Sequence, residues 1–193
     1  MDEKEAIKRV QKGETGVFGE LIKLYEKPVY NHCRGFLRNE QEAQDAAQEV
    51  FVNVFRAIKR FRGDSKLGTW IYRITSNVCK NRLKQLKRIN GPLIDDAQEN
   101  EDGEVTSMVE KIKEKEEKEP DREYASKSTR ELITRRISEL TDEQKQVILL
   151  RDVEGRSYEE IGRIMRLSVS AVKSKLFRAR ENLRDRLKRD EIL

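Results

Sequence analysis

The first ninety residues carry apolar side chains at the spacing of amphipathic α-helices. One such pattern covers residues 17–37. A second starts after Asn39, which can cap a helix, and Glu42 is placed three residues later to close a capping box. The stripe on this second helix is broad, and we expect all of it in a core: Ala43, Ala46, Ala47, Val50, Phe51, Val54, Phe55 and Ile58.

The opposite face of the same helix is polar. Its members are Asp45, Gln48, Glu49, Val52, Asn53 and Arg56. The pattern by itself predicts only that this face meets solvent, because charged and amide side chains most often lie at the surface.

A loop and a further helix follow. The loop is predicted between positions 61 and 70 from its turn-forming residues, Gly63, Asp64, Ser65 and Gly68. Ser65 or Thr69 is the expected cap of the next helix, over residues 70–83, whose inward side chains are Ile71, Ile74, Val78 and Leu83.

The outward side of this helix mixes cations and amides at three- and four-residue spacing: Arg73, Asn77, Lys80, Asn81 and Lys84. Trp70 and Tyr72 stand near its start. Cations hold phosphates, amides read base edges and aromatic rings stack on unpaired bases, so the stripe suits single-stranded DNA. A solvated helix face with Trp70 in the core is the alternative, and the pattern leaves both open.

The last third of the chain shows three helix starts. Capping boxes open helices at Thr141 and Ser157, and Ser168 can cap a third. Leu167 and Ser168 form a turn between a short helix and a longer basic one. This is the helix-turn-helix arrangement, whose second helix enters the DNA major groove N-terminus first. The apolar face of the long helix is Val169, Val172, Leu176, Ala179 and Leu183.

The other face of the long helix carries Ser170, Lys173, Ser174, Phe177, Arg178 and Glu181. Lys and Arg on such a face can pair with guanine edges. Further cations are better placed for phosphates, which position a protein on DNA without specifying sequence: Lys175, Arg180, Arg184 and Lys188. A small helical bundle with a basic surface is the competing interpretation, which the caps and the turn spacing disfavour.

Charge divides the 193 residues into three parts, with net charges of +8 over 1–90, −6 over 91–130 and +3 over 131–193. Between Arg56 and Arg88 there are 11 basic residues and one acid, which favours a polyanionic partner. With 36% hydrophobic and 40% charged residues, two small cores are more consistent than one large core. We predict an all-α fold of two helical domains, 1–90 and 126–193, joined by a flexible acidic linker over 91–125.

Little in the sequence indicates an enzyme. It contains no Gly-rich phosphate loop, paired-carboxylate constellation or metal-spaced Cys/His cluster, so we expect no catalytic residue, cofactor or metal. His32 is the only histidine, and Cys33 and Cys79 are the only cysteines; helix packing explains them better than a two-ligand metal site. Two cysteines are too few for a disulfide framework, which favours a reducing cytoplasm. From the charged start and the lack of a long apolar run we expect neither a secretory signal peptide nor a membrane span.

Together the motifs resemble those of bacterial sigma factors of the extracytoplasmic-function (ECF) group. They occur in the family's order: DAAQEVF at 45–51, FRGDS and TWIYRI with Asn77 at 61–77, and SYEEI with VKSKLFRAR at 157–180. In that family the first motif binds RNA polymerase, the second melts the promoter and the third is the helix-turn-helix.

The resemblance implies a partner for each surface. The polar face at Asp45, Gln48, Glu49, Val52, Asn53 and Arg56 would dock on the clamp helices of the largest subunit of RNA polymerase core, which replaces the solvent interpretation. The minus-ten element would be opened and its non-template strand held by Phe61, Arg62, Lys66, Trp70, Arg73, Asn77, Lys80, Asn81 and Lys84, with Asn77 reading a base. The minus-thirty-five element would be read as a duplex by Ser170, Lys173, Ser174, Lys175, Phe177, Arg178 and Arg180.

The resemblance also implies contact with the flap of the second largest polymerase subunit and a linker that threads the polymerase. It further implies control, in an envelope or stress response, by an anti-sigma factor, which in this family is often held at the membrane. No small-molecule substrate is implied. The chain departs from the family pattern at Ser170-Ala171, at Leu67-Gly68 and at Arg166, where the turn often carries glycine and is therefore expected to be strained. A helix-turn-helix regulator that acts without polymerase is the rival function; it explains residues 131–193 but not the first domain's motifs.

Overall fold

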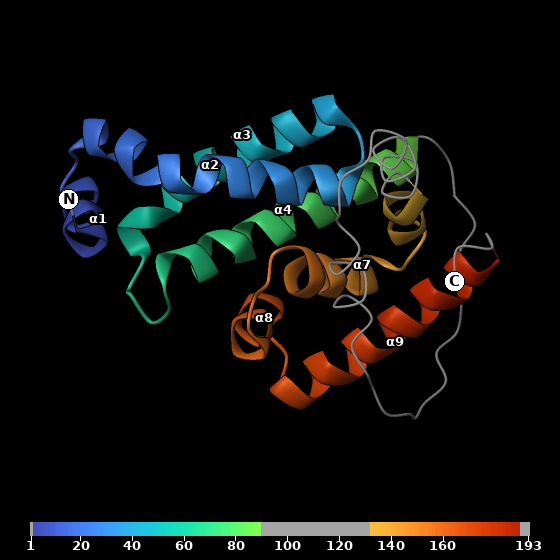
Figure 1. Ribbon diagram of the computed structural model, residues 1–193. Helices are drawn as coiled ribbons and strands as arrows, with labels where there is room; N and C mark the ends of the chain where they lie inside the picture. Colours follow the sequence, from blue (N-terminus) through green and yellow to red (C-terminus); the bar gives the residue numbers. More distant parts are fainter. Residues whose placement is uncertain (1, 90–131, 190–193) are drawn as a thin grey trace, which may run out of the picture. The chain divides into compact units, whose positions relative to one another are not determined.

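The computed structural model describes residues 2–89 and 132–189, which form helices and no strands. The chain divides into two compact units on either side of the intervening segment (Figure 1). This confirms the predicted all-α fold with two helical regions. The predicted linker over 91–125 lies outside the described residues, and the predicted domain boundaries stay predictions.

Unit 1 is built on three long helices that pack along one another (Figure 1). They are α2 (Thr15–Leu37), α3 (Glu40–Ala57) and α4 (Leu67–Ile89). The short helix α1 (Glu3–Gln11) packs on α2 and on the 3-10 helix η1 (Ile58–Arg60). The centre of the unit is largely apolar, with Val29, Cys33, Val50, Ile71 and Cys79 at 0% exposure, and the equally buried Thr75 donates its hydroxyl to a backbone carbonyl.

The two cysteines are free thiols buried in this core, with their sulfur atoms 3.6 Å apart. His32 is also buried, 5.5 Å from the ring of Tyr72 in an edge-on contact. The prediction that His32, Cys33 and Cys79 belong to helix packing is therefore confirmed.

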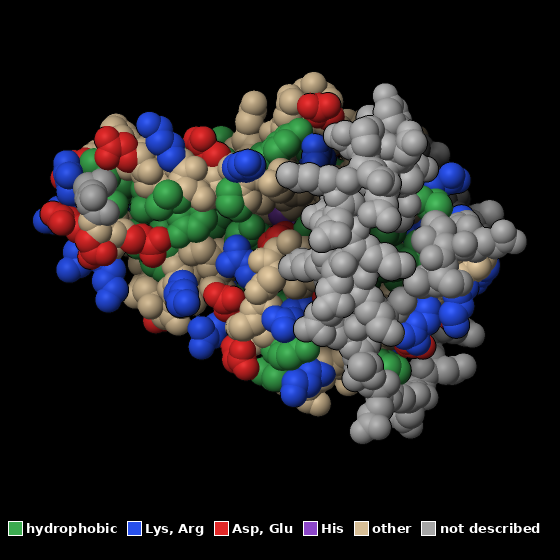
Figure 2. All heavy atoms as spheres, viewed as in Figure 1, with side chains coloured by type: hydrophobic (Ala, Val, Ile, Leu, Met, Phe, Trp, Pro, Cys, Tyr) green, Lys and Arg blue, Asp and Glu red, His purple; other side chains and the backbone are tan. Residues whose placement is uncertain are grey.

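The predicted core stripe of α3 is too wide. Phe55 is 42% exposed and Phe51 is only partly buried, while the other six members are buried. Phe55 sits at the edge of the stripe and packs edge-on against Phe18 of α2, with ring centroids 5.0 Å apart. Figure 2 likewise shows hydrophobic side chains at the surface of unit 1 over α2, between charged ones. A hydrophobic side chain at the margin of a helix face can pack against a neighbouring side chain and still remain partly exposed to solvent.

Helix α4 begins three residues earlier than predicted. Gly68 and Thr69 lie in its first turn, and Thr69 is buried, so Thr69 is not the cap and Gly68 is not in the loop. Two of the four predicted inward residues, Ile74 and Leu83, are only partly buried, and Tyr72 is 1% exposed and belongs to the core rather than to the aromatic groups available to bases. The helix starts early because Leu67 reaches the core, with 1% exposure.

Unit 2 contains a helical segment over 132–138, α7 (Asp142–Ile148) with its π-helical extension η2 (Leu149–Val153), α8 (Tyr158–Met165) and α9 (Val169–Lys188) (Figure 1). Both predicted capping boxes are present, at Thr141 with Gln144 and at Ser157 with Glu160. Ser168 caps α9 by accepting the Ala171 N–H. The core face of α9 is buried at Val172, Leu176 and Ala179, whereas Val169 is 37% exposed and Leu183 is only partly buried, against expectation.

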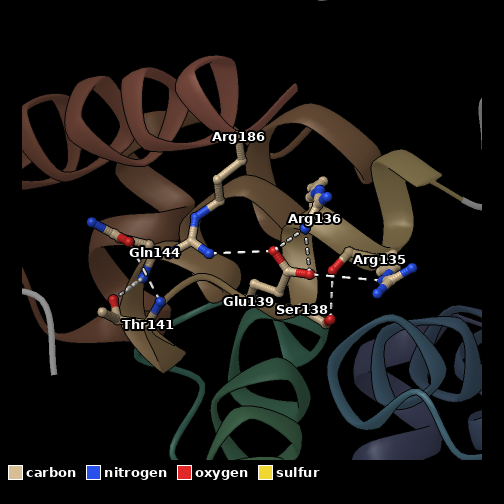
Figure 3. Close-up of polar contacts among 7 residues, drawn as sticks. All are labelled: Arg135, Arg136, Ser138, Glu139, Thr141, Gln144 and Arg186. Carbon is tan, nitrogen blue, oxygen red and sulfur yellow. Dashed lines mark hydrogen bonds and ion pairs between the residues drawn. The ribbon is translucent and has the colours of Figure 1, made fainter. Parts of the chain in front are cut away.

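A network around Glu139 ties the start of unit 2 to the far end of α9 (Figure 3). Arg136 donates to both carboxylate oxygens at 2.8 Å, and Arg186 of α9 donates at 3.3 Å. Partial burial alone would raise the pKa of Glu139, but these hydrogen bonds and charges outweigh it and hold that pKa below its usual range.

Candidate nucleic-acid interface

The loop before α4 runs from Phe61 to Lys66, with Gly63 at a positive φ of 79°. Arg62 and Lys66 are exposed, as a phosphate-holding role requires. Phe61 and Trp70 are half-buried and pack on each other, with ring centroids 5.0 Å apart. The two rings therefore pack together where the loop joins α4, and each remains partly accessible to solvent. Trp70 is thus neither fully in the core nor fully exposed, the two alternatives that the sequence left open.

The predicted stripe on α4 lies on its solvent side. Asn77, Asn81 and Lys84 are exposed, and Arg73 and Lys80 are partly exposed. Within the described residues none of these five side chains has an ion-pair partner. The loop leads directly into the first turns of α4, so the nine predicted minus-ten residues follow one another along the loop and the solvent side of α4 in a single unit.

The polar face of α3 is partly committed to α4. Gln48, Glu49, Val52 and Arg56 are exposed and Asn53 is only partly exposed, while the Asp45 carboxylate accepts a hydrogen bond from Arg82 at 3.1 Å. Arg82 also pairs with Glu42. The hydrogen bond to Glu42 raises the pKa of Arg82 against the opposing effect of partial burial. Asp45 therefore links α3 to α4 in addition to lying on the predicted polymerase-binding face.

The turn between α8 and α9 depends on close backbone approach. A Cβ at Gly162 would lie 2.8 Å from the carbonyl oxygen of Leu167, closer than real Cβ contacts allow. The Leu167 N–H also donates to the Gly162 carbonyl at 2.9 Å. Arg166 has a φ of 60°, the left-handed region that favours glycine, which confirms the predicted strain of this turn.

The seven predicted minus-thirty-five residues fall into two groups. Ser170, Lys173 and Ser174 are exposed on the first turns of α9, with Phe177 and Arg178 partly exposed behind them. The remaining two are paired with acids of the same unit: Lys175 pairs with the exposed Glu143 at 2.5 Å, and the largely buried Arg180 binds both oxygens of Asp152. Hydrogen bonding to Asp152 raises the pKa of Arg180, although burial opposes it.

A cation–π arrangement supports the exposed end of α9. The Tyr158 ring has the Arg151 guanidinium 4.6 Å from its centroid and the Lys173 ammonium at 5.6 Å. Such contacts restrain a long side chain without neutralising its charge. Lys173 is thereby presented as a positive group at the N-terminal end of the helix that a major groove would receive.

Sequence reasoning missed one residue that supports the candidate interface from behind. Gln11, at the end of α1, donates hydrogen bonds to two backbone carbonyls beside the loop, although 47 and 50 positions separate it from them. No periodicity or capping rule predicts a pairing over that distance. Within residues 2–89 and 132–189 we find no cluster of metal-ligating side chains and no helix long and apolar enough to cross a membrane.

Comparison with known proteins gives matches in both units. The model of the family described as Sigma-70 region 2 matches residues 21–89, and that of Sigma-70, region 4, matches residues 130–183. The chain is 35% identical to the RNA polymerase sigma-H factor of Pseudomonas aeruginosa, over 93% of this chain and 90% of that protein. It is 35% identical to the ECF RNA polymerase sigma-E factor of Escherichia coli, over 91% of this chain and 88% of that protein.

Two solved structures share the fold. One, of CnrH in complex with the cytosolic domain of CnrY, has a TM-score of 0.66 and 20% identity, and covers 98% of this chain and 99% of that chain. The other, of the sigma factor RpoE in complex with the anti-sigma factor NepR from Bartonella quintana, has a TM-score of 0.62 and 18% identity over 89% of this chain and 96% of that chain.

Proposed function

Because the chain belongs to the Sigma-70 family of RNA polymerase sigma factors, in its ECF group, and so directs transcription initiation, we propose a division of labour among its three surfaces. The exposed part of the α3 face, Gln48, Glu49, Val52 and Arg56, binds the clamp helices of polymerase core. The loop and the α4 stripe open the minus-ten element and hold its non-template strand. The first turns of α9 read the minus-thirty-five element as a duplex.

One observation carries the minus-ten assignment: five cations and amides on α4, free of ion-pair partners among the described residues, adjoin a loop closed by two accessible aromatic rings. Phosphates are held by cations, and unpaired bases stack on aromatic rings at about 1–3 kcal/mol each. A helix that met only intact duplex would not need the rings, since paired bases offer no faces for stacking. The rings therefore support a role in holding the melted strand.

In unit 2 the structure favours a smaller reading surface than the sequence predicted. Ser170, Lys173, Ser174, Phe177 and Arg178 are accessible and lie on the helix end that enters a major groove first. Arg180 is excluded from the proposal because its guanidinium is occupied by Asp152, with only 15% of its side chain exposed. Lys175 is retained as a phosphate contact of secondary importance.

The role is one of recognition, and the bond-forming chemistry belongs to the polymerase. We place its action in the cytoplasm, at the nucleoid, where transcription takes place. We also propose that an anti-sigma factor binds the chain, as NepR binds RpoE in one of the structurally similar complexes. The rival function, a helix-turn-helix regulator without polymerase, leaves the region 2 match unexplained and is not favoured.

The test begins with reconstitution of the full chain with polymerase core. Transcribed templates are selected from random DNA, and permanganate footprinting then maps the melted strand. We expect Asn77→Ala to lower permanganate reactivity of the minus-ten region about tenfold or more while duplex binding changes little, because the amide lies at the surface and acts only on an unpaired base. Gln85→Ala, an exposed amide later on the same helix, is the matched control. Unchanged reactivity in Asn77→Ala contradicts the assignment, and failure of the wild-type holoenzyme to initiate on any template contradicts the proposed function as a whole.

A further inference from the structure

Helix α1 lies outside the matched region 2 segment, which starts at residue 21. It is nevertheless an integral part of unit 1, because Ala6, Ile7 and Val10 are buried at 9% exposure or less. These three side chains fix the helix against α2 and η1, so its last residue has a defined position near the loop.

That last residue is Gln11, and its side-chain amide touches the loop directly. The Nε2 group donates to the carbonyl of Ile58 at 3.0 Å and to the carbonyl of Phe61 at 2.9 Å. The Phe61 carbonyl lies just past the end of η1, and Gln11 supplies it with a donor, whereas the Ile58 carbonyl accepts the Gln11 amide in addition to the Phe61 N–H at 3.0 Å. Gln11 also fixes the peptide between Phe61 and Arg62, from which the loop leaves the body of the unit.

The other end of the loop is held from the same helix through an intermediate. Glu3, in the first turn of α1, accepts a hydrogen bond of 2.5 Å from the Tyr25 hydroxyl. The Tyr25 ring lies against Gly68, where a Cβ would be 3.1 Å from Tyr25 Cε1. Gly68 is in the first turn of α4, immediately after the loop. Helix α1 therefore contacts the start of the loop directly, through Gln11, and supports its end indirectly, through Tyr25.

We infer that α1 is a positioning element for the promoter-melting loop, and that Gln11 is the residue through which it acts. This inference rests on the proposed function of the loop. A loop whose backbone is already fixed loses less conformational entropy when it captures a strand, so it binds that strand more tightly. Gln11 itself is assigned no contact with DNA; it sets the course of the backbone that carries Phe61, Arg62 and Lys66.

The test measures binding of the holoenzyme to a single-stranded oligonucleotide that carries the selected non-template minus-ten sequence. Gln11→Met keeps the length and the helix propensity of the side chain but removes the donor. We expect it to bind the strand about tenfold more weakly, which corresponds to roughly 1.4 kcal/mol. Gln11→Lys keeps a donor within reach of the carbonyls and is expected to stay within about threefold of wild type, a rescue consistent with a donated hydrogen bond.

Lys8→Met is the matched control, because Lys8 is exposed on the same helix. It is expected to bind the strand like wild type. Affinity for polymerase core and for the isolated minus-thirty-five duplex is measured for every variant and is expected to stay unchanged. Tyr25→Phe, which removes only the hydroxyl, provides a second and milder lesion at the other end of the loop, with an expected loss of about threefold in strand binding.

Equal strand affinity of Gln11→Met and Lys8→Met overturns the inference. If the wild-type holoenzyme binds the strand and initiates in the same experiment, the proposed function is not affected by that result. The inference is also overturned when Gln11→Met loses core affinity in the same proportion as strand affinity, because that pattern indicates general damage to unit 1. A wild-type holoenzyme that binds no selected strand overturns the proposed function instead.

Discussion

The two segments assigned to DNA are held in place in opposite ways. In unit 2 the turn before α9 is fixed by its immediate neighbours: Ser168 caps the helix, and Gly162 admits the Leu167 carbonyl five positions later. In unit 1 the loop before α4 is fixed by Gln11, 47 and 50 positions away from its two hydrogen-bond partners. The proposed major-groove helix is thus positioned by residues close to it in sequence, and the proposed strand-holding loop is positioned by a residue far from it in sequence.

This difference matches the task assigned to each segment. A helix that enters a groove needs one rigid orientation, which a cap and a close backbone contact supply. A loop that accepts flipped nucleobases needs ends that are fixed to the domain and a middle part that stays accessible. The half-buried Phe61 and Trp70 rings provide both, since each is packed on the other and still partly open to solvent.

The largest expected effect is that of Gly162→Ala, which disrupts the close backbone contact in the turn before α9. The new Cβ would meet the backbone oxygen of Leu167 at 2.8 Å, so the turn must open. We expect a loss of about 3 kcal/mol in the free energy of unfolding of unit 2. Since the only tryptophan, Trp70, belongs to unit 1, urea unfolding followed by its fluorescence should not change, while the circular dichroism transition of unit 2 shifts to lower urea.

Gly19→Ala is the control for this substitution. Nothing lies within 4 Å of a Cβ at Gly19, so the same change should stabilise α2 by about 0.5–1 kcal/mol. A Gly162→Ala protein as stable as wild type would show that the turn is not constrained by backbone contact.

A smaller effect is expected from the buried ion pair of unit 2. Arg180→Met leaves Asp152, 11% exposed, without its partner, and we expect a loss of about 2–3 kcal/mol in unfolding free energy. Adding Asp152→Leu should restore most of the lost unfolding free energy, because two apolar side chains carry no desolvation cost.

The counterpart in unit 1, Arg82→Met, should lower the unfolding free energy less, by about 1–2 kcal/mol, since Arg82 is 26% exposed.

The double variant also separates the structural role of Arg180 from a role on DNA. We expect it to bind the minus-thirty-five duplex with the wild-type dependence on salt. A reduction of the log–log salt slope by about 0.9 would mean that Arg180 does contact a phosphate, as the sequence alone predicted.

The sequence was informative where structure is determined over a few residues. Caps at Asn39, Thr141, Ser157 and Ser168 could be predicted because a side chain there meets a backbone group three positions away. The sequence was less informative where a cation could pair either with DNA or with an acidic side chain of the same unit. Arg180 and Lys175 are cations on a predicted DNA-binding helix, but in the structure they pair with Asp152 and Glu143, and only the packing of α9 on α7, which continues into η2, brings these acids near.

The smallest expected effect concerns the strain at Arg166. Its φ of 60° is costly for a residue with a Cβ, and its side chain is exposed, so Arg166→Gly should relieve strain. Glycine also gains freedom in the unfolded chain, which offsets part of the relief, and we expect a net gain of about 0.5 kcal/mol in unfolding free energy. Arg163→Gly removes the same side chain from an exposed position inside α8, where the helical backbone gives glycine no advantage, and should cost about 0.5–1 kcal/mol. The two variants lose the same charge, so opposite signs of their effects would trace the difference to backbone conformation, whereas equal signs would mean that the strain of the turn is not relieved locally.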